Sequence, residues 1–233
     1  MQHFILNRFS PALTQTAAYD GESKLLTLLG QMLPADLKGK KVLDFGCGEG
    51  GETAELARLG LRAYGCDIRD LSEARERYPE AWFGKAEDLP EKVDYIISLD
   101  AFEHFGDPAA ILAQMADLLK PGGEVITSFG PTWRHPLGGH LFSVFPWAHL
   151  IFTERALIEW RSKHCSDGAT RFGEVEGGLN QMTIRRFEAL VKDSPFRLES
   201  LECAPIRRLR ALHCRLTREF TTAIVRCRLS VGT

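Results

Sequence analysis

The sequence has no long run of apolar residues. No stretch of the 233-residue chain approaches the roughly 18 consecutive apolar residues that a membrane-spanning helix needs. Residues 1–10 contain no apolar run followed by a small-residue cleavage site, so we expect no secretory signal. These absences predict a protein without a membrane span that stays in the cytoplasm.

A strong charge of either sign is also absent, since the formal net charge is -2. This argues against a protein whose whole surface attracts a polyanion. The cysteines lack any close pair of the metal-binding or redox type, so we expect reduced and mostly buried thiols. The six cysteines are Cys47, Cys66, Cys165, Cys203, Cys214 and Cys227.

Apolar residues make up 44% of the chain and charged residues 26%, which is typical of folded proteins and excludes a disordered chain. The length fits a single domain over residues 1–233, with room for one sizeable insertion.

Short apolar segments alternate with helical patterns over the first 130 residues. A leading helix is expected over residues 21–33, because Pro34 follows at the point where a helix should end. The five alternations that follow predict a parallel sheet covered on both faces. Strands are expected at residues 41–45, 62–66, 82–83, 93–99 and 124–129, and later at 196–203 and 220–229. Helices are expected at residues 52–59, 70–78, 108–119 and 183–192.

The character of the sequence changes between residues 131 and 180. This stretch contains three of the four tryptophans and four of the seven histidines, with a helical rhythm only around residues 153–163. We expect an inserted cap over the sheet, whose aromatic side chains form either a lid over a ligand or a small core of the insertion. These aromatic residues are Trp133, Phe142, Phe145, Trp147 and Phe152.

A glycine-rich turn follows the first expected strand. Residues 42–50 read VLDFGCGEG, so a strand leads through Asp44 to the turn, and the next helix directs its backbone N–H groups back at it. The spacing Gly46-x-Gly48-x-x-Gly51 also satisfies the fingerprint of dinucleotide-binding proteins, so the glycines alone do not identify the ligand.

Carboxylates at three strand ends favour one kind of ligand. Asp44 would repel a pyrophosphate but attract the ammonium of an amino acid. Asp67 ends the second strand, where a carboxylate can accept both hydroxyls of a ribose. Glu87 and Asp88 form an acidic edge where an adenine amino group would lie. This distribution predicts a nucleoside whose tail is a cationic amino acid.

Five motifs in order resemble those of the class I S-adenosylmethionine-dependent methyltransferases, in particular the group that includes quinone-biosynthesis and small-molecule methyltransferases. They are VLDFGCGEG, YGCDI, AEDLP, DYIISLDAFEHFGDP and LKPGGEVITS, within residues 40–129. The resemblance implies an α/β fold with a Rossmann-like, seven-stranded, mostly parallel sheet, helices on both faces, an antiparallel last strand and a cap inserted after the fifth strand. It also implies S-adenosylmethionine as cofactor and S-adenosylhomocysteine as product.

The resemblance assigns roles to the residues around the cofactor. Asp67 would hold the ribose hydroxyls, Ile68 would pack on the adenine and Asp88 would face its amino group. The methionyl end would lie over the glycine turn, beside Leu99 and Asp100. The implied cofactor-binding residues are Asp44, Gly46, Cys47, Gly48, Asp67, Ile68, Glu87, Asp88, Leu89, Leu99 and Asp100.

The histidines are candidates for a base near the methyl group, because a hydroxyl or amine acceptor must lose a proton. His135 and His140 are the first candidates, because they follow the fifth strand, at whose carboxyl end a ligand crevice is expected. His104 and His149 are the others. In one alternative, His135 and His140 only hold the loop through hydrogen bonds. In another they bind a metal with His149, but their spacing matches no compact ligand pattern, and we expect no metal.

An arginine cluster lies between residues 206 and 228, with seven arginines against one acid, Glu219. It either contacts an anion, such as a nucleic-acid backbone or a charged small molecule, or protects a solvated strand edge from aggregation. The arginines are Arg207, Arg208, Arg210, Arg215, Arg218, Arg226 and Arg228.

The favoured function is in-line methyl transfer to a hydroxyl or amine of a small-molecule acceptor. We expect residues 131–180 to select this acceptor. The alternatives are a nucleic-acid (RNA) methyltransferase that uses the arginine cluster and a non-catalytic cofactor-binding protein. A homodimer is left open.

Overall fold

The computed structural model describes residues 2–8, 25, 29, 32–34, 38–142, 145–165, 168–175 and 178–232. Most of the helix predicted over residues 21–33 lies outside the described residues. Within that stretch Leu25 and Leu29 are buried, in a cluster with Val42 and Leu56.

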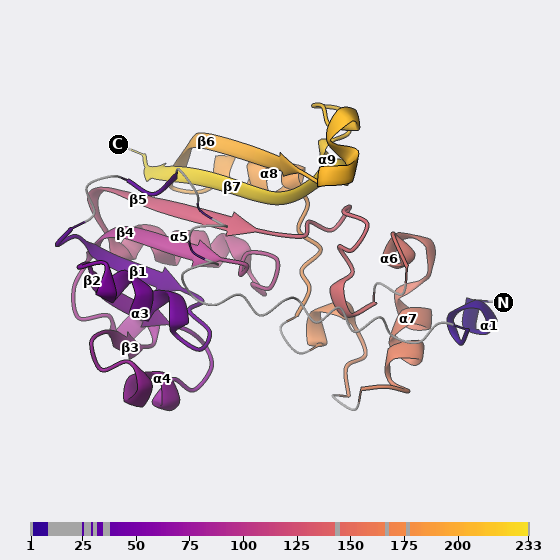
Figure 1. Ribbon diagram of the computed structural model, residues 1–233, viewed down its shortest axis with the longest axis horizontal. Helices are drawn as coiled ribbons and strands as arrows, with labels where there is room; N and C mark the ends of the chain where they lie inside the picture. The colour runs from indigo at the N-terminus through magenta and orange to yellow at the C-terminus, as the bar shows by residue number, and fades with distance from the viewer. Residues whose placement is uncertain are drawn as a thin grey trace.

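A seven-stranded sheet forms the centre of the molecule, with the strand order β3-β2-β1-β4-β5-β7-β6 (Figure 1). The strands are β1 (Lys41–Phe45), β2 (Arg62–Cys66), β3 (Trp82–Gly84), β4 (Val93–Leu99), β5 (Leu119–Phe129), β6 (Phe196–Pro205) and β7 (Thr222–Val231). The first five strands are parallel, and β7 is antiparallel to both of its neighbours. The predicted Rossmann-like sheet with an antiparallel last strand is therefore confirmed.

Helices cover both faces of this sheet. Neighbouring strand residues point to opposite sides, so each face carries apolar side chains that pack against helices. On one face Leu43 and Ile96 pack with residues of α5 (Pro108–Leu118) and α8 (Ile184–Lys192). On the other face Val42 and Ile97 pack with Leu56 of α3 (Gly51–Arg58). The other described helices are α1 (Gln2–Leu6), α4 (Ser72–Arg77), α6 (Ala148–Ile151), α7 (Glu154–Arg161) and α9 (Arg218–Thr221). In the part of the chain that the structure describes, no helix is long and apolar enough to cross a membrane.

Several strand boundaries differ from the prediction, among them the starts of β5 and β7. β5 begins at Leu119, which pairs with Val93, and the pairing shifts register before Glu124, so Pro121 and the glycines after it form an irregularity inside the strand. β7 begins at Thr222, because the chain first makes the short helix α9.

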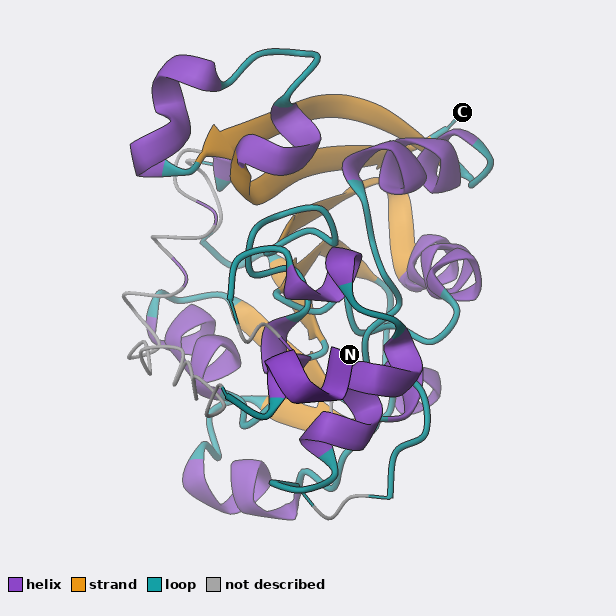
Figure 2. Cartoon of the chain, turned by 90° about the vertical axis from the view of Figure 1, so that its right-hand side faces the viewer, coloured by secondary structure: helices purple, strands orange, loops and turns teal. Residues whose placement is uncertain are grey.

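The segment between β5 and α8, which faces the viewer in Figure 2, has a hydrophobic cluster of its own. Phe142 and Phe152 are buried in this cluster with Trp160 of α7, as the small-core interpretation of the insertion expects. Leu6 of α1 is buried in the same cluster, so α1 packs on the insertion. The sequence pattern did not indicate α1.

We expect Cys214 to react first with a thiol reagent. Cys214 is exposed, and a hydrogen bond from the Thr217 hydroxyl lowers the pKa of its thiol. Burial raises the pKa of Cys66 to about 12 and also raises the pKa of Cys227. A disulfide-exchange titration near neutral pH should show a single fast phase that disappears in Cys214→Ser. Persistence of that phase in the variant would contradict this assignment.

Candidate functional site

The glycine turn after β1 is held by backbone conformations that glycine adopts most readily. Gly46 and Gly48 have φ of 84° and 59°. The N–H groups of Gly46 and Cys47 donate to the carbonyl of Cys66 at the end of β2, at 2.8 and 3.0 Å. A Cβ on Gly46 would lie 3.0 Å from the Cβ of Ala101, so the turn lies directly against the loop after β4. The turn and this loop form two sides of one site.

This site lies at the position in the sheet where the strand order reverses. β1 pairs with β2 on one side and with β4 on the other, and the carboxyl ends of all three strands meet there. In open α/β sheets, ligands bind in the crevice at such a point.

Asp44 is buried beneath the turn. Its Oδ2 accepts a hydrogen bond of 2.8 Å from the hydroxyl of Thr53 on α3. Burial, and after it the charges of Asp44 and Asp67, raise the pKa of the Cys47 thiol, which keeps that thiol neutral. A negative charge below the turn is unfavourable for a pyrophosphate placed over it.

Asp67 faces the turn from the end of β2. Its Oδ2 accepts the N–H of Gly48 at 2.9 Å, and its Oδ1 accepts the N–H of Arg69 at 3.0 Å. The Arg69 guanidinium also contacts this carboxylate, with Nε 3.3 Å from Oδ1. The Arg69 side chain is 63% exposed and that of Asp67 only 9%, so the arginine can move into solvent while the carboxylate stays fixed. The carboxylate thus has a fixed position at the end of β2, beside the glycine turn.

The residues expected around the adenine lie at the open edge of the site. Ile68 is fully exposed, and Glu87 and Asp88 are exposed on the 3-10 turn η2 (Ala86–Asp88), followed by the half-buried Leu89. A cavity of about 300 Å³ lies between the glycine turn and α4 and is lined in part by Gly48, Arg69 and Leu71. Ile68, Glu87 and Asp88 are not among the described residues that line this cavity, so the structure does not bring the cavity and the acidic edge together.

The loop after β4 is tied to the end of β5. Leu99 is buried, and the chain turns at Asp100, whose φ is 50° and whose N–H donates to the carbonyl of Ser128 at 2.9 Å. The buried Glu103 accepts the N–H of Gly130 at 3.1 Å. These contacts fix the loop on the side expected to face the methionyl end.

Asn180, at the far end of the insertion, holds the same loop. Its Nδ2 donates to the carbonyls of Phe102 and Phe105 at 2.6 and 2.9 Å, and its backbone N–H donates to the carbonyl of Glu103 at 3.0 Å. The sequence analysis missed this residue, since a single asparagine far along the chain carries no pattern that marks such a contact. These hydrogen bonds connect the insertion directly to the loop after β4.

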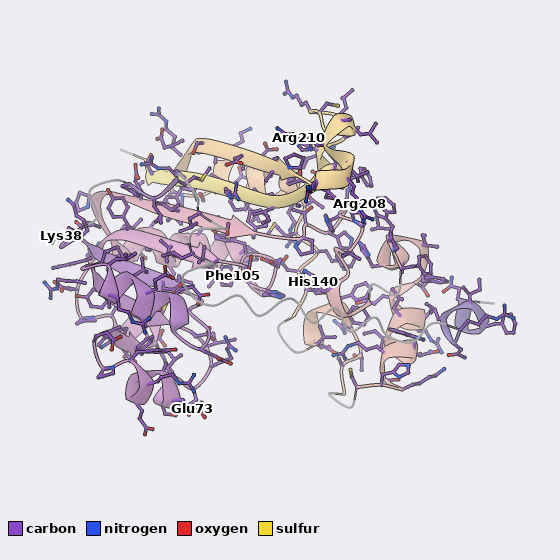
Figure 3. All side chains as sticks on the ribbon, in the orientation of Figure 1. Lys38, Glu73, Phe105, His140, Arg208 and Arg210 are labelled. Atoms are coloured by element: carbon purple, nitrogen blue, oxygen red, sulfur yellow. The ribbon has the colours of Figure 1, made fainter. Side chains whose placement is uncertain are left out.

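His104 and His140 are brought together where the insertion meets the sheet; Figure 3 labels Phe105 and His140 in this region. Their ring centroids are 5.5 Å apart. His104 Nδ1 lies 2.7 Å from the carbonyl of Gly178. Because a carbonyl only accepts, Nδ1 carries the proton, and the lone pair of a neutral His104 is on Nε2.

His135 and His149 form hydrogen bonds with the backbone of the insertion. His135 Nδ1 accepts the N–H of Leu137 at 2.9 Å, so its lone pair is committed to the backbone. His149 Nε2 donates to the carbonyl of Trp133 at 2.6 Å. Across the ranges that the structure describes, no three His, Cys, Asp or Glu side chains are grouped to hold a metal ion.

We expect the stability of the protein to fall as the pH is lowered from 6.5 toward 4. Burial, and after it neighbouring histidines, lower the pKa of His135 and of His140 from 6.5 to about 4. In this pH window the unfolded chain binds more protons than the folded chain, so acid favours unfolding, whereas above 6.5 the contribution is fully present.

Urea unfolding at pH 7 and pH 5 checks this. His135→Gln with His140→Gln should reduce the loss of unfolding free energy between the two pH values. His164→Gln, at an exposed histidine, is the matched control and should leave that loss unchanged. An equal loss in the wild type and the double variant would contradict the expectation.

Comparison with known proteins identifies the family of this chain. A family profile described as a methyltransferase domain matches residues 17–199. The ubiquinone biosynthesis O-methyltransferase of Methylococcus capsulatus is 31% identical over 192 residues, which are 70% of this chain and 80% of that protein. The corresponding enzyme of Stutzerimonas stutzeri is 36% identical over 104 residues, 40% of this chain and 45% of that protein. Apart from the Methylococcus protein, the chain spans about half the length of the curated relatives it matches.

Solved structures share the fold at low identity. The magnesium protoporphyrin IX methyltransferase of Synechocystis PCC 6803, with bound SAH, has a TM-score of 0.56 at 18% identity, over 91% of this chain and 83% of that one. An S-adenosylmethionine-dependent methyltransferase of Mesorhizobium loti has a TM-score of 0.57 at 18% identity, over 90% and 97%.

The fold is thus that of the class I S-adenosylmethionine-dependent methyltransferases, as the order of the sequence motifs predicts. The chain belongs to the methyltransferase-domain family.

Proposed function

We propose that this protein transfers a methyl group from S-adenosylmethionine to a hydroxyl group of a small-molecule acceptor and releases S-adenosylhomocysteine. The observation that carries the proposal is the Asp67 carboxylate, held by the N–H of Gly48 at the strand-order reversal and beside a turn with a buried negative charge below it. The O-methyltransferase names of the relatives support a hydroxyl acceptor.

The acid distribution distinguishes this ligand from a pyridine dinucleotide. Asp67 suits the ribose of either cofactor, but Asp44 beneath the turn favours an amino-acid ammonium over a pyrophosphate. When bound, S-adenosylmethionine supplies an already activated methyl group, so the protein contributes alignment, exclusion of water and removal of one proton.

The tied loop after β4 performs the alignment in this proposal. Asn180 and Ser128 hold its backbone from two sides, so Asp100 and His104 keep fixed positions relative to the glycine turn. Holding reacting groups at a near-attack distance is worth roughly 7–11 kcal/mol in favourable cases. The residues of the insertion, 131–180, select the acceptor in this account.

His104 removes the proton from the acceptor hydroxyl. With Nδ1 bonded to the carbonyl of Gly178, its Nε2 is the atom able to accept. The neighbouring His140 is neutral at pH 7, because burial and after it His104 lower its pKa to about 4. His135 takes the alternative role of holding the loop, since its lone pair accepts the N–H of Leu137.

The RNA alternative has less support from the site. Three of the seven arginines in the cluster form ion pairs with acids of this chain: Arg218 with Glu188, Arg226 with Glu202 and Arg228 with Glu124. The homodimer and the cytoplasmic location stay predictions.

Isothermal titration calorimetry with S-adenosylmethionine, S-adenosylhomocysteine and NAD⁺ tests the cofactor assignment. We expect both adenosyl compounds to bind with a stoichiometry of one and NAD⁺ to give no heat. Binding of NAD⁺ with equal or higher affinity would overturn the proposal.

A further inference from the structure

The connection between β6 and β7, residues 206–221, exposes three large apolar side chains. Leu212 is 64% exposed, Leu216 is 91% exposed and Phe220 is 41% exposed. The connection consists of the 3-10 helix η5 (Arg207–Leu212), a turn and α9, and it projects beyond the end of the sheet (Figures 1 and 2). We call it the β6–β7 projection.

The same projection concentrates positive charge. Arg207, Arg208, Arg210 and Arg215 are exposed and form no ion pair with any residue that the structure describes (Figure 3 labels Arg208 and Arg210). The one acid of this stretch, Glu219, is buried, and its carboxylate accepts two backbone N–H groups at the start of α8. Its charge therefore points into the protein, and the outer surface of the projection is basic.

Hydrogen bonds hold the backbone of the β6–β7 projection. The N–H of Ile206 donates to the carbonyl of Thr221 at 2.8 Å and closes its base. The N–H of Cys214 donates to the Thr217 hydroxyl at 3.0 Å, and the Arg134 guanidinium of the insertion lies 5.7 Å from the Phe220 ring centroid. The apolar side chains thus point to solvent from a fixed backbone, although exposing them loses the free energy of burial.

We propose that the β6–β7 projection docks the protein on the surface of an anionic lipid bilayer, with its arginines at the headgroup phosphates and its leucines in the acyl boundary. Unpaired arginines beside exposed aliphatic and aromatic side chains are the combination that binds such an interface. The bilayer is favoured over a nucleic acid because Leu212 and Leu216 gain burial in a hydrocarbon layer and gain nothing from a phosphate backbone.

The test is co-sedimentation of the full chain with vesicles of phosphatidylglycerol and phosphatidylcholine. Wild type should bind these vesicles and not vesicles of phosphatidylcholine alone. The triple variant Arg207→Glu, Arg208→Glu, Arg210→Glu should lower the partition coefficient by about tenfold or more. The matched control, Arg58→Glu, Arg155→Glu, Arg171→Glu, makes the same change in net charge at exposed arginines elsewhere and should retain binding.

A second variant separates the two parts of the interface. Leu212→Ser with Leu216→Ser should weaken binding most clearly at high salt, where the attraction of the arginines is screened. Leu59→Ser, at another exposed leucine, is its control. Thermal unfolding is measured for every variant to check that it is folded, because the control arginines lose their ion pairs with Glu80, Glu159 and Glu174.

Three results would overturn the proposal. One is no binding of the wild type to anionic vesicles. Another is an equal loss of binding in the patch and control arginine variants. The third is unchanged vesicle binding in the leucine variant together with tighter binding to a single-stranded RNA oligonucleotide than to vesicles, which would identify a nucleic-acid surface.

Discussion

Replacing Asp67 by alanine should weaken the binding of S-adenosylmethionine by about 100-fold or more. A hydrogen bond to a charged group contributes about 1.5–3 kcal/mol, and the variant removes the acceptor of two ribose hydroxyls. Each 1.4 kcal/mol corresponds to about tenfold in the dissociation constant. Calorimetry with the purified variant measures this change directly.

The control for Asp67→Ala is a change at Arg69. In the structure the Arg69 guanidinium contacts the Asp67 carboxylate, and its Nη2 lies 2.8 Å from the place of a Cβ on Gly48, so in our proposal it competes with the ribose. Arg69→Ala should therefore leave the affinity unchanged or raise it. An affinity of Asp67→Ala within threefold of wild type would show that this carboxylate does not hold the cofactor.

Replacing His104 by glutamine should lower kcat by about 100-fold, since general base catalysis contributes roughly 10²–10⁴ in rate. The affinity for S-adenosylmethionine should stay the same, because the imidazole is expected to act on the acceptor. Stopped-assay kinetics with a hydroxyl acceptor and calorimetry together separate the two effects.

His135→Gln is the matched comparison for His104. Its Nδ1 accepts the N–H of Leu137, so its loss should loosen the loop and raise KM for the acceptor, with a smaller effect on kcat. If His104→Gln kept its kcat, or lost cofactor affinity in proportion to kcat, His104 would have a structural role only.

Much of the sheet could be predicted because its strands are short apolar runs between glycine turns. β1 and β4 match the expected ranges, since their residues are buried on both faces and leave no polar alternation to confuse the boundary. The start of β5 was harder to predict from the sequence, because the register shift before Glu124 depends on pairing with β4. α1 has too few residues for a periodic pattern, and it is held by contacts with a distant part of the chain.

The cofactor side of the site was more predictable than the acceptor side. Asp67 and the glycines lie at strand ends that the sequence pattern locates, whereas the roles of the histidines depend on backbone partners. The carbonyl that sets the tautomer of His104 belongs to Gly178, 74 residues away. The sequence ranked His135 and His140 ahead of His104 because they follow the fifth strand, and the hydrogen bonds change that order in our proposal.

Transfer of an isotope-labelled methyl group tests the central claim most directly. The protein is incubated with methyl-labelled S-adenosylmethionine and a small-molecule extract, and mass spectrometry follows both the extract and the cofactor. We expect one hydroxyl-bearing component to gain a methyl group, about 14 Da without the label, with an equal amount of S-adenosylhomocysteine formed. Bound S-adenosylmethionine with no S-adenosylhomocysteine from any extract would contradict the account and favour a non-catalytic cofactor-binding protein.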